Sequence, residues 1–108
     1  MIEITYYRKY SRVTVAGHAM TDEYGKDLVC SAASILANTL ADRVRVFSNQ
    51  SMVRGAVTNM EPGNTEISCN PTTHYKSIVT MVFDTICAGF ELLAQSFPDS
   101  VKFVSHEG

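Results

Sequence analysis

The 108-residue chain has no tryptophan, and it contains only three prolines and six glycines. So few prolines and glycines exclude a collagen-like or low-complexity chain, because those sequences carry a far larger share of both. The chain also lacks a large excess of either charge, since it has nine Lys and Arg and eleven Asp and Glu, for a formal net charge of -2. Without a strongly basic field to neutralise phosphates, we expect no stable binding of nucleic acid.

Cysteine is sparse and unpatterned. Cys30, Cys69 and Cys87 are an odd number, and no two of them have the spacing of a zinc ribbon or a thioredoxin motif. A secreted disulfide framework is therefore not expected. A zinc set of His18, Cys30, Cys69 and His74 is the alternative, but it lacks a closely spaced ligand pair. We predict neither a metal site nor a cofactor.

Long hydrophobic runs are missing as well. Polar residues interrupt the apolar stretches before the ~18 residues that a membrane-spanning helix needs. The first ten residues alternate in character and show no basic start followed by an apolar run, so no signal peptide is predicted. We expect a cytoplasmic protein without a membrane partner.

The residues present are those of a small folded domain, with 45% hydrophobic residues. A chain of this length forms one domain, residues 1–108, and buries about 65% of the surface that its unfolded form exposes. It therefore needs no metal or disulfide for stability.

Alternating apolar and polar residues, with turn signals between the runs, predict five strands. They cover residues 2–7, 12–19, 51–60, 64–69 and 101–105. The first two are expected to form one hairpin, and the next two another around a Pro-Gly turn at 61–63. With two intervening helices, the ββαββαβ order favours a two-layer α+β fold: an about five-stranded, mostly antiparallel sheet with both helices on one face.

Two segments have helical spacing. The first begins at Leu28 behind an Asp27 N-cap and lasts about five turns. The second begins at Thr72 or Thr73, and it ends at Phe97 before a proline. Its expected core stripe is Tyr75, Val79, Val82, Ile86, Phe90, Leu93 and Phe97, with Phe83 and Cys87 placed beside that stripe. A helix apolar over so much of its circumference is buried centrally or shared with another subunit.

Cys30 and His18 are the residues best placed for chemistry. Cys30 falls at about the third position of the first predicted helix, where free backbone N–H groups and the helix dipole favour a thiolate. His18 ends the second strand, and the intervening residues are enough to fold it back beside the thiol. A cysteine with a base within reach is a nucleophile. Taken alone, a helical cysteine is more often a packed core residue.

A predicted surface loop separates the two residues. It consists of Met20, Thr21, Asp22, Glu23, Tyr24, Gly25 and Lys26. Acidic residues, a glycine and no apolar periodicity are typical of a mobile or functional loop of this length.

Two short motifs flank that loop. They are Gly17-His18-Ala19 and Asp27-Leu28-Val29-Cys30-Ser31-Ala32-Ala33-Ser34. Together they resemble the ribosomal-processing cysteine protease family, often called Prp, and the order of elements agrees over essentially the whole chain. Ser31 stands where alanine would be more familiar.

The resemblance implies a cysteine endopeptidase that acts on a ribosomal protein precursor. The family removes an N-terminal extension from large-subunit ribosomal protein number twenty-seven in Firmicutes and related bacteria, cutting after an aromatic residue. By motif position, His18 is then the general base, Cys30 the nucleophile, and Asp27 and Ser34 supporting or substrate-binding residues. The loop at 20–26 corresponds to a flap over bound peptide, and family members are homodimers.

No third catalytic residue can be assigned from the sequence. Asp22, Glu23, Asp27 and Asn38 are candidates by proximity in sequence alone, so a Cys/His dyad is expected. The alternative function is a noncatalytic module that binds a ribosomal protein or an assembly factor.

Two remaining features are interpreted as structural. Arg43, Arg45 and Arg54 are dispersed and predict a solvated face, and His106 is expected in a frayed tail.

Overall fold

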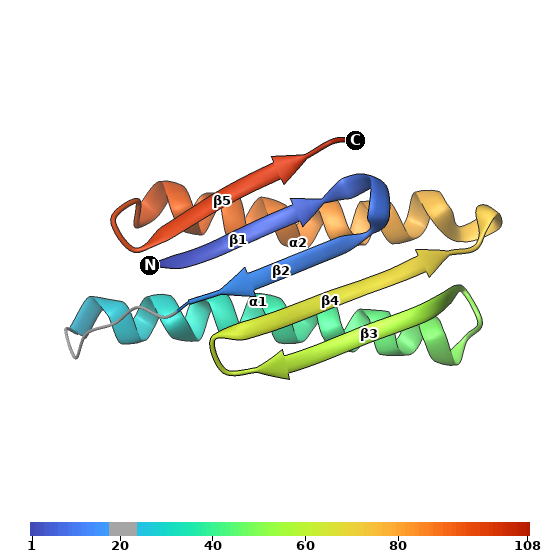
Figure 1. The fold of residues 1–108 in the computed structure, drawn as a ribbon, viewed down its shortest axis with the longest axis horizontal. Helices are drawn as coiled ribbons and strands as arrows, with labels where there is room; N and C mark the ends of the chain where they lie inside the picture. Colours follow the sequence, from blue (N-terminus) through green and yellow to red (C-terminus); the bar gives the residue numbers. More distant parts are fainter. Residues whose placement is uncertain (18–23) are drawn as a thin grey trace.

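A computed structural model describes residues 1–17 and 24–108, with side chains described for 1–17 and 28–108. These residues form two layers, a five-stranded sheet with both helices on one of its faces (Figure 1). The predicted α+β fold and its element order are confirmed. The elements are β1 (Ile2–Tyr7), η1 (Arg8–Tyr10), β2 (Arg12–Ala16), α1 (Tyr24–Asn49), β3 (Val53–Glu61), β4 (Asn64–Pro71), η2 (Thr73–Tyr75), α2 (Lys76–Ser96) and β5 (Val101–His106).

The sheet is mixed, with strand order β3-β4-β2-β1-β5. Three of its four pairings are antiparallel, and β5 lies parallel to β1. The parallel pair arises because the chain leaves β4 at one end of the sheet and returns along α2 to enter β5 at the other (Figure 1). Parallel neighbours need such a crossover, and a helix commonly supplies it.

One face of the sheet and the inner faces of both helices make the core. Strand alternation places Ile2, Ile4 and Tyr6 of β1 in the buried layer, as predicted. Residues that are essentially inaccessible come from all three parts of this core: Ile4, Val13, Ile67, Val29, Leu40, Val44, Val79, Phe83 and Phe90.

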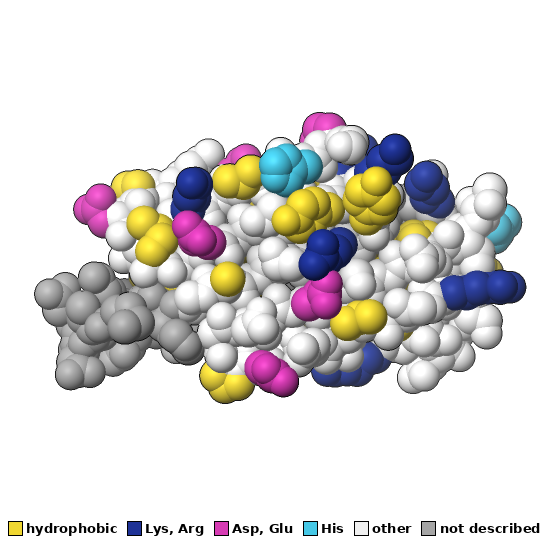
Figure 2. Space-filling model, viewed as in Figure 1, with side chains coloured by type: hydrophobic (Ala, Val, Ile, Leu, Met, Phe, Trp, Pro, Cys, Tyr) yellow, Lys and Arg dark blue, Asp and Glu magenta, His cyan; other side chains and the backbone are white. Residues whose placement is uncertain are grey.

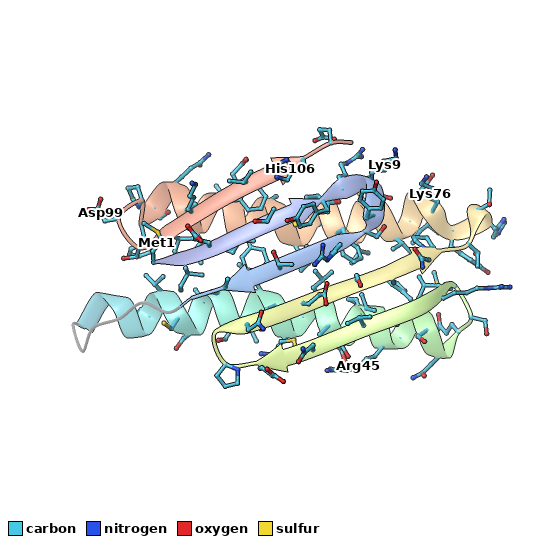
Figure 3. The ribbon with its side chains drawn as sticks, viewed as in Figure 1. Met1, Lys9, Arg45, Lys76, Asp99 and His106 are labelled. Carbon is cyan, nitrogen blue, oxygen red and sulfur yellow. The ribbon has the colours of Figure 1, made fainter. Side chains whose placement is uncertain are left out.

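The opposite face of the sheet faces solvent and carries interspersed charges (Figure 2). Arg12 forms an ion pair of 2.6 Å with Glu66 on β4, and the Arg12 guanidinium lies 5.0 Å from the centre of the Tyr7 ring. Arg45 is exposed on α1 and lies beside β3 in this view (Figure 3). The visible surface therefore presents both signs of charge side by side.

Helix α1 begins earlier than predicted, and this corrects two expectations. Its first residue is Tyr24, so Tyr24, Gly25 and Lys26 are helical, and Asp27 is the fourth residue instead of the N-cap. Sequence alone could not separate these cases, because Asp is favoured both at the cap and within the first turn. Cys30 is consequently the seventh helical residue, beyond the turn in which backbone N–H groups are free.

Helix α2 is rotated relative to its predicted stripe. Phe83 and Cys87 are buried, whereas Val82 and Ile86 are half-buried and Phe97 is exposed. The helix contacts α1 as well as the sheet: an added Cβ on Gly89 would lie 2.8 Å from a Leu36 methyl group. The broad apolar face of α2 packs against both the sheet and α1. Helical periodicity does not indicate which part of that face contacts the sheet.

Residues 73–96 are long and apolar enough to cross a membrane by length and composition alone, so the expectation that no segment would reach that limit was wrong. Within the domain, Val79, Phe83 and Phe90 of this segment belong to the common core. Only 28% of its most apolar window is buried, however. The helix thus has more apolar surface than this domain covers.

His106 is not in a frayed tail. It ends β5 opposite Tyr7 in the parallel register, and the two rings stack with their centres 5.4 Å apart (Figure 3). Pairing with β1 extends order to this residue, which single-sequence composition did not reveal.

A polar network fastens the end of β1 to α2. The Tyr6 hydroxyl donates to Asp84 Oδ1 at 2.7 Å, and Arg8 donates to both Asp84 oxygens at 3.1 Å. The Arg8 guanidinium lowers the pKa of Asp84, while burial and the carboxylate raise the pKa of Tyr6.

The core predicts a large effect for Phe90→Ala. Phe90 is fully buried, so the substitution removes its transfer free energy and leaves a cavity, lowering the free energy of unfolding by about 3–5 kcal/mol. Urea titration followed by circular dichroism measures this. Gln95→Ala, exposed on the same helix, is the control and should change stability by less than about 0.5 kcal/mol. Equal effects of the two variants would contradict the described packing.

Candidate active site

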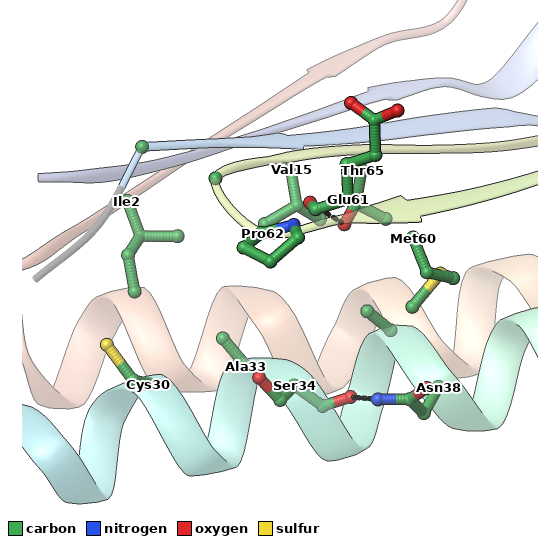
Figure 4. Close-up of a pocket in the computed structure, with 13 residues that line it drawn as sticks. Ile2, Val15, Cys30, Ala33, Ser34, Asn38, Met60, Glu61, Pro62 and Thr65 are labelled. Carbon is green, nitrogen blue, oxygen red and sulfur yellow. Dashed lines mark hydrogen bonds between the residues drawn. The ribbon is translucent and has the colours of Figure 1, made fainter.

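Cys30 lies on the flank of α1 and opens into a cavity of about 310 Å³. It is half-buried, whereas Cys69 and Cys87 are buried. Ser34, one helical turn later, lines the same cavity. The structure therefore brings together Cys30 and Ser34, two of the residues predicted for the site (Figure 4).

The cavity lies between α1 and the tip of the β3–β4 hairpin, with the ends of β1 and β2 beside it (Figure 4). Its lining comes from three parts of the chain. On α1 it is Cys30, Ala33, Ser34, Ala37 and Asn38; on β1 and β2 it is Ile2 and Val15, with Gly17 directly after β2; on the hairpin it is Met60, Glu61, Pro62, Gly63 and Thr65. The cavity is thus walled by α1 on one side and by the hairpin on the other.

Gly17, the first residue of the Gly-His-Ala motif, is fixed at the edge of the groove. Its φ of +88° is a conformation that L side chains rarely adopt, and an added Cβ would collide with the Met1 carbonyl oxygen. Its N–H donates to the Gly63 carbonyl at 3.0 Å. The strand end that leads into His18 is thereby tied to the hairpin turn, which gives a physical reason for glycine at this motif position.

His18 itself lies outside the described residues, as do Met20, Thr21, Asp22 and Glu23, so the structure does not test their predicted roles. Asp27 lies in α1, and its side chain is likewise outside the description. The predicted loop is corrected for Tyr24, Gly25 and Lys26, which are helical.

Asn38, a candidate third catalytic residue, lies well away from the thiol along α1. It stands eight residues after Cys30 on the same helix, about 12 Å further along the axis. Its Nδ2 donates to the Ser34 carbonyl at 2.8 Å. Asn38 therefore lines the groove at a distance from the thiol.

Sequence reasoning missed the hairpin side of this groove. The Pro-Gly signal at 61–63 located only the turn. Nothing in a single sequence says that this turn lies over the flank of α1, because that depends on how the helix sits on the sheet.

Comparison with known families now bears on this site. A family model described as cysteine protease Prp matches residues 1–102. The chain belongs to this family. A comparison with curated proteins gave no match.

Solved structures of similar fold agree with the assignment to the Prp family. SMU.848 from Streptococcus mutans has a TM-score of 0.70 at 22% identity, covering 99% of this chain and 93% of that one. An essential ribosomal processing protease Prp from S. aureus, in complex with a covalently linked product peptide, has a TM-score of 0.69 at 18% identity, with 97% of each chain covered. The protease of that name with a substrate peptide gives 0.69 at 17% identity, again over 97% of each chain. At such identities these similarities establish the fold alone.

As a Prp-family member, the protein is a cysteine protease, and its three thiols differ in surroundings. Burial raises the pKa of Cys69 to about 11, and burial together with Asp84 raises that of Cys87 to about 12. Both cysteines are buried in the core, where they act as packing residues. Cys69 faces the core from β4 and does not line the Cys30 cavity, which argues against the zinc alternative. Among the described residues, no three His, Cys, Asp or Glu side chains gather as metal ligands.

These surroundings predict selective alkylation. With iodoacetamide near pH 7.5, Cys30 should react much faster than Cys69 or Cys87, because the thiolate is the reactive species and the two buried thiols remain protonated far above that pH. Peptide mapping by mass spectrometry measures each rate. His18→Ala should slow the reaction of Cys30 and leave the other two unchanged. Equal labelling of all three thiols would count against a catalytic Cys30.

Proposed function

We propose that the protein is a cysteine endopeptidase that removes the N-terminal extension of large-subunit ribosomal protein number twenty-seven and so supports ribosome maturation. The observation that carries the proposal is that Cys30, alone among the three thiols, is only half-buried and lines the cavity between α1 and the β3–β4 hairpin. The family assignment supports the activity. The S. aureus protease structures, one with a substrate peptide and one with a linked product, support the kind of substrate.

The proposed chemistry uses a Cys30/His18 dyad. His18 accepts the thiol proton, and Cys30 Sγ attacks the scissile carbonyl carbon. The C–N bond breaks as His18 returns the proton to the leaving amine, which leaves the extension bonded to Cys30 as a thioester. Water, deprotonated by His18, then hydrolyses the thioester and restores the thiol.

The position of Cys30 makes the histidine indispensable in this scheme. The favourable interaction of a helix dipole with an anion falls off within the first turn, and Cys30 is the seventh residue of α1. The base must therefore supply most of the activation. Ser34 is proposed to contact the substrate from the groove wall, and Asp27 to support the dyad. The substrate-covering role is proposed for residues 20–23, the part of the predicted loop outside α1.

Cleavage of the precursor tests this function directly. Purified protein incubated with a peptide spanning the extension junction should release the extension, with the cut after an aromatic residue, as mass spectrometry will show. Cys30→Ala and Cys30→Ser should abolish release because both lack the thiol nucleophile. Cys69→Ala is the matched control and should retain activity. Cleavage by Cys30→Ala would contradict the assignment of Cys30 as the nucleophile. Tight binding of the peptide by the unmodified protein, without cleavage, would favour the noncatalytic binding module.

The same proposal includes a homodimer formed through the helical layer. On α1, Leu28 and Ile35 are exposed and lie seven residues apart. On α2, Ile78 and Leu92 are exposed and lie fourteen residues apart, so each pair lies on one face of its helix. Ile35 precedes Leu36, which contacts Gly89 on α2, and Leu92 lies one turn beyond that glycine. The two exposed rows therefore border one seam, and a second copy of the chain would cover the apolar surface that α2 leaves open.

Sedimentation at micromolar concentration should accordingly give about twice the 11.9 kDa chain mass. Ile35→Glu should shift the protein to the monomer, because a carboxylate in an apolar interface loses its hydration without a partner. Asn59→Glu, exposed on β3, should leave the dimer intact. A monomer mass for the unmodified chain would refute the dimer but would not contradict the proposed peptidase activity.

We also propose that the protein works in the cytoplasm without a cofactor and without a stable nucleic-acid or membrane partner. The near-neutral charge and the interspersed surface charges support brief encounters with a precursor protein more than residence on RNA.

A further inference from the structure

The end of β2 is held from both sides at the point where the chain continues into His18. β2 pairs with β4 along its whole length, and one residue further on the Gly17 N–H donates to the Gly63 carbonyl at 3.0 Å. On the other side, the Met1 carbonyl leaves no room for a Cβ on Gly17. The backbone that enters His18 therefore has a fixed starting point, because consecutive Cα atoms are about 3.8 Å apart.

The bond between Gly17 and Gly63 depends on the shape of the hairpin turn. Pro62 and Gly63 are the two loop residues between Glu61 and Asn64, which pair with each other. Gly63 has a φ of +77°, and proline followed by a glycine of positive φ is the pattern of a type II turn. A β-branched residue is strained at this φ, whereas asparagine tolerates it. The residue at position 63 therefore decides whether the turn keeps its shape and its carbonyl in place.

The turn, the end of β2 and the thiol border one cavity. Gly63, Gly17 and Cys30 all line it, and Pro62 points from the turn toward α1 (Figure 4). Cys30 is fixed on the helix beside Val29, which is fully buried. A shift of the turn therefore moves the end of β2 relative to the thiol. Displacements of about 1 Å can lower a rate by about 10²-fold even when they arise away from the reacting atoms.

We propose that Gly63 is a positioning residue, whose carbonyl holds the end of β2 so that His18 reaches the Cys30 thiol, an inference that rests on the proposed function and its dyad. Gly63 takes no part in bond making or proton transfer. It acts through the backbone of Gly17, so its effect on the thiol exists only while His18 is present.

Gly63→Val tests this role through the alkylation of Cys30 by iodoacetamide near pH 7.5. Valine distorts the turn and displaces the carbonyl, so the rate for Cys30 should fall by about tenfold, toward that of His18→Ala. Cys69 and Cys87 should keep their rates. Gly63→Asn, which tolerates the positive φ, should restore most of the Cys30 rate. Gly63→Ala, less strained than valine at this φ, should give an intermediate rate and serves where Gly63→Val does not fold.

The double variant His18→Ala/Gly63→Val distinguishes positioning from a general distortion of the cavity. If Gly63 acts through His18, the double variant should react no more slowly than His18→Ala alone, the non-additivity expected of two coupled residues. A further tenfold loss in the double variant would overturn the proposal, because the effect of Gly63 would then not pass through the histidine.

Gly55→Val is the matched control. Gly55 is also a glycine of positive φ, at +58°, and it lies at the bulge of β3, where an added Cβ would be 3.3 Å from the Asn70 side chain. It does not line the Cys30 cavity. Valine at this position should lower stability in urea titration and leave the alkylation of Cys30 unchanged. Equal slowing of Cys30 by Gly55→Val would overturn the proposal, since the slowing would then follow from lost stability alone.

The same measurements separate this role from the proposed function. If His18→Ala leaves the Cys30 rate unchanged, the dyad is contradicted, and the positioning role with it. If His18→Ala slows Cys30 and none of the Gly63 variants does, only the positioning role of Gly63 is overturned.

Discussion

The packing of α1 against the sheet is the constraint on which the rest of the structure depends. Val29, Leu40 and Val44 are fully buried against the strands, and this fixes the rotation of the helix about its axis. Because residues on a helix keep their angular spacing, the same rotation leaves Cys30 and Ser34 on the flank, under the hairpin tip. The core thus decides which thiol can meet a substrate.

Two glycines allow the surrounding parts to come close enough to complete that arrangement. Gly17 permits the end of β2 to pass against Met1 and to bond to Gly63, which joins the motif strand to the hairpin turn. Gly89 permits α1 and α2 to approach at Leu36. The first contact shapes the proposed catalytic groove, and the second brings together the apolar rows proposed for the dimer. Catalysis and association would then use opposite flanks of α1.

Much of the fold could be predicted because alternation and helical spacing are local properties. The five strands, the two helices and the face on which the helices lie all follow from them. The start of α1 was placed four residues late, since aspartate suits both a cap and a first turn. The predicted buried face of α2 was wrong by a rotation about the helix axis. Phe83 and Cys87 lie on a broad apolar surface that contacts both the sheet and α1, and helical spacing did not indicate which part of this surface would be buried.

The sequence by itself determined the chemistry available: one cysteine and one histidine in a motif pair specific to the Prp family, and a serine one turn from that cysteine. Only the tertiary structure decided that Cys69 and Cys87 are shielded while Cys30 opens into a groove, and that Met60 and Pro62 face it. The physical reason is that exposure and cavity shape arise from contacts between residues far apart in the chain. Local spacing carries no information about which hairpin lies over which helix.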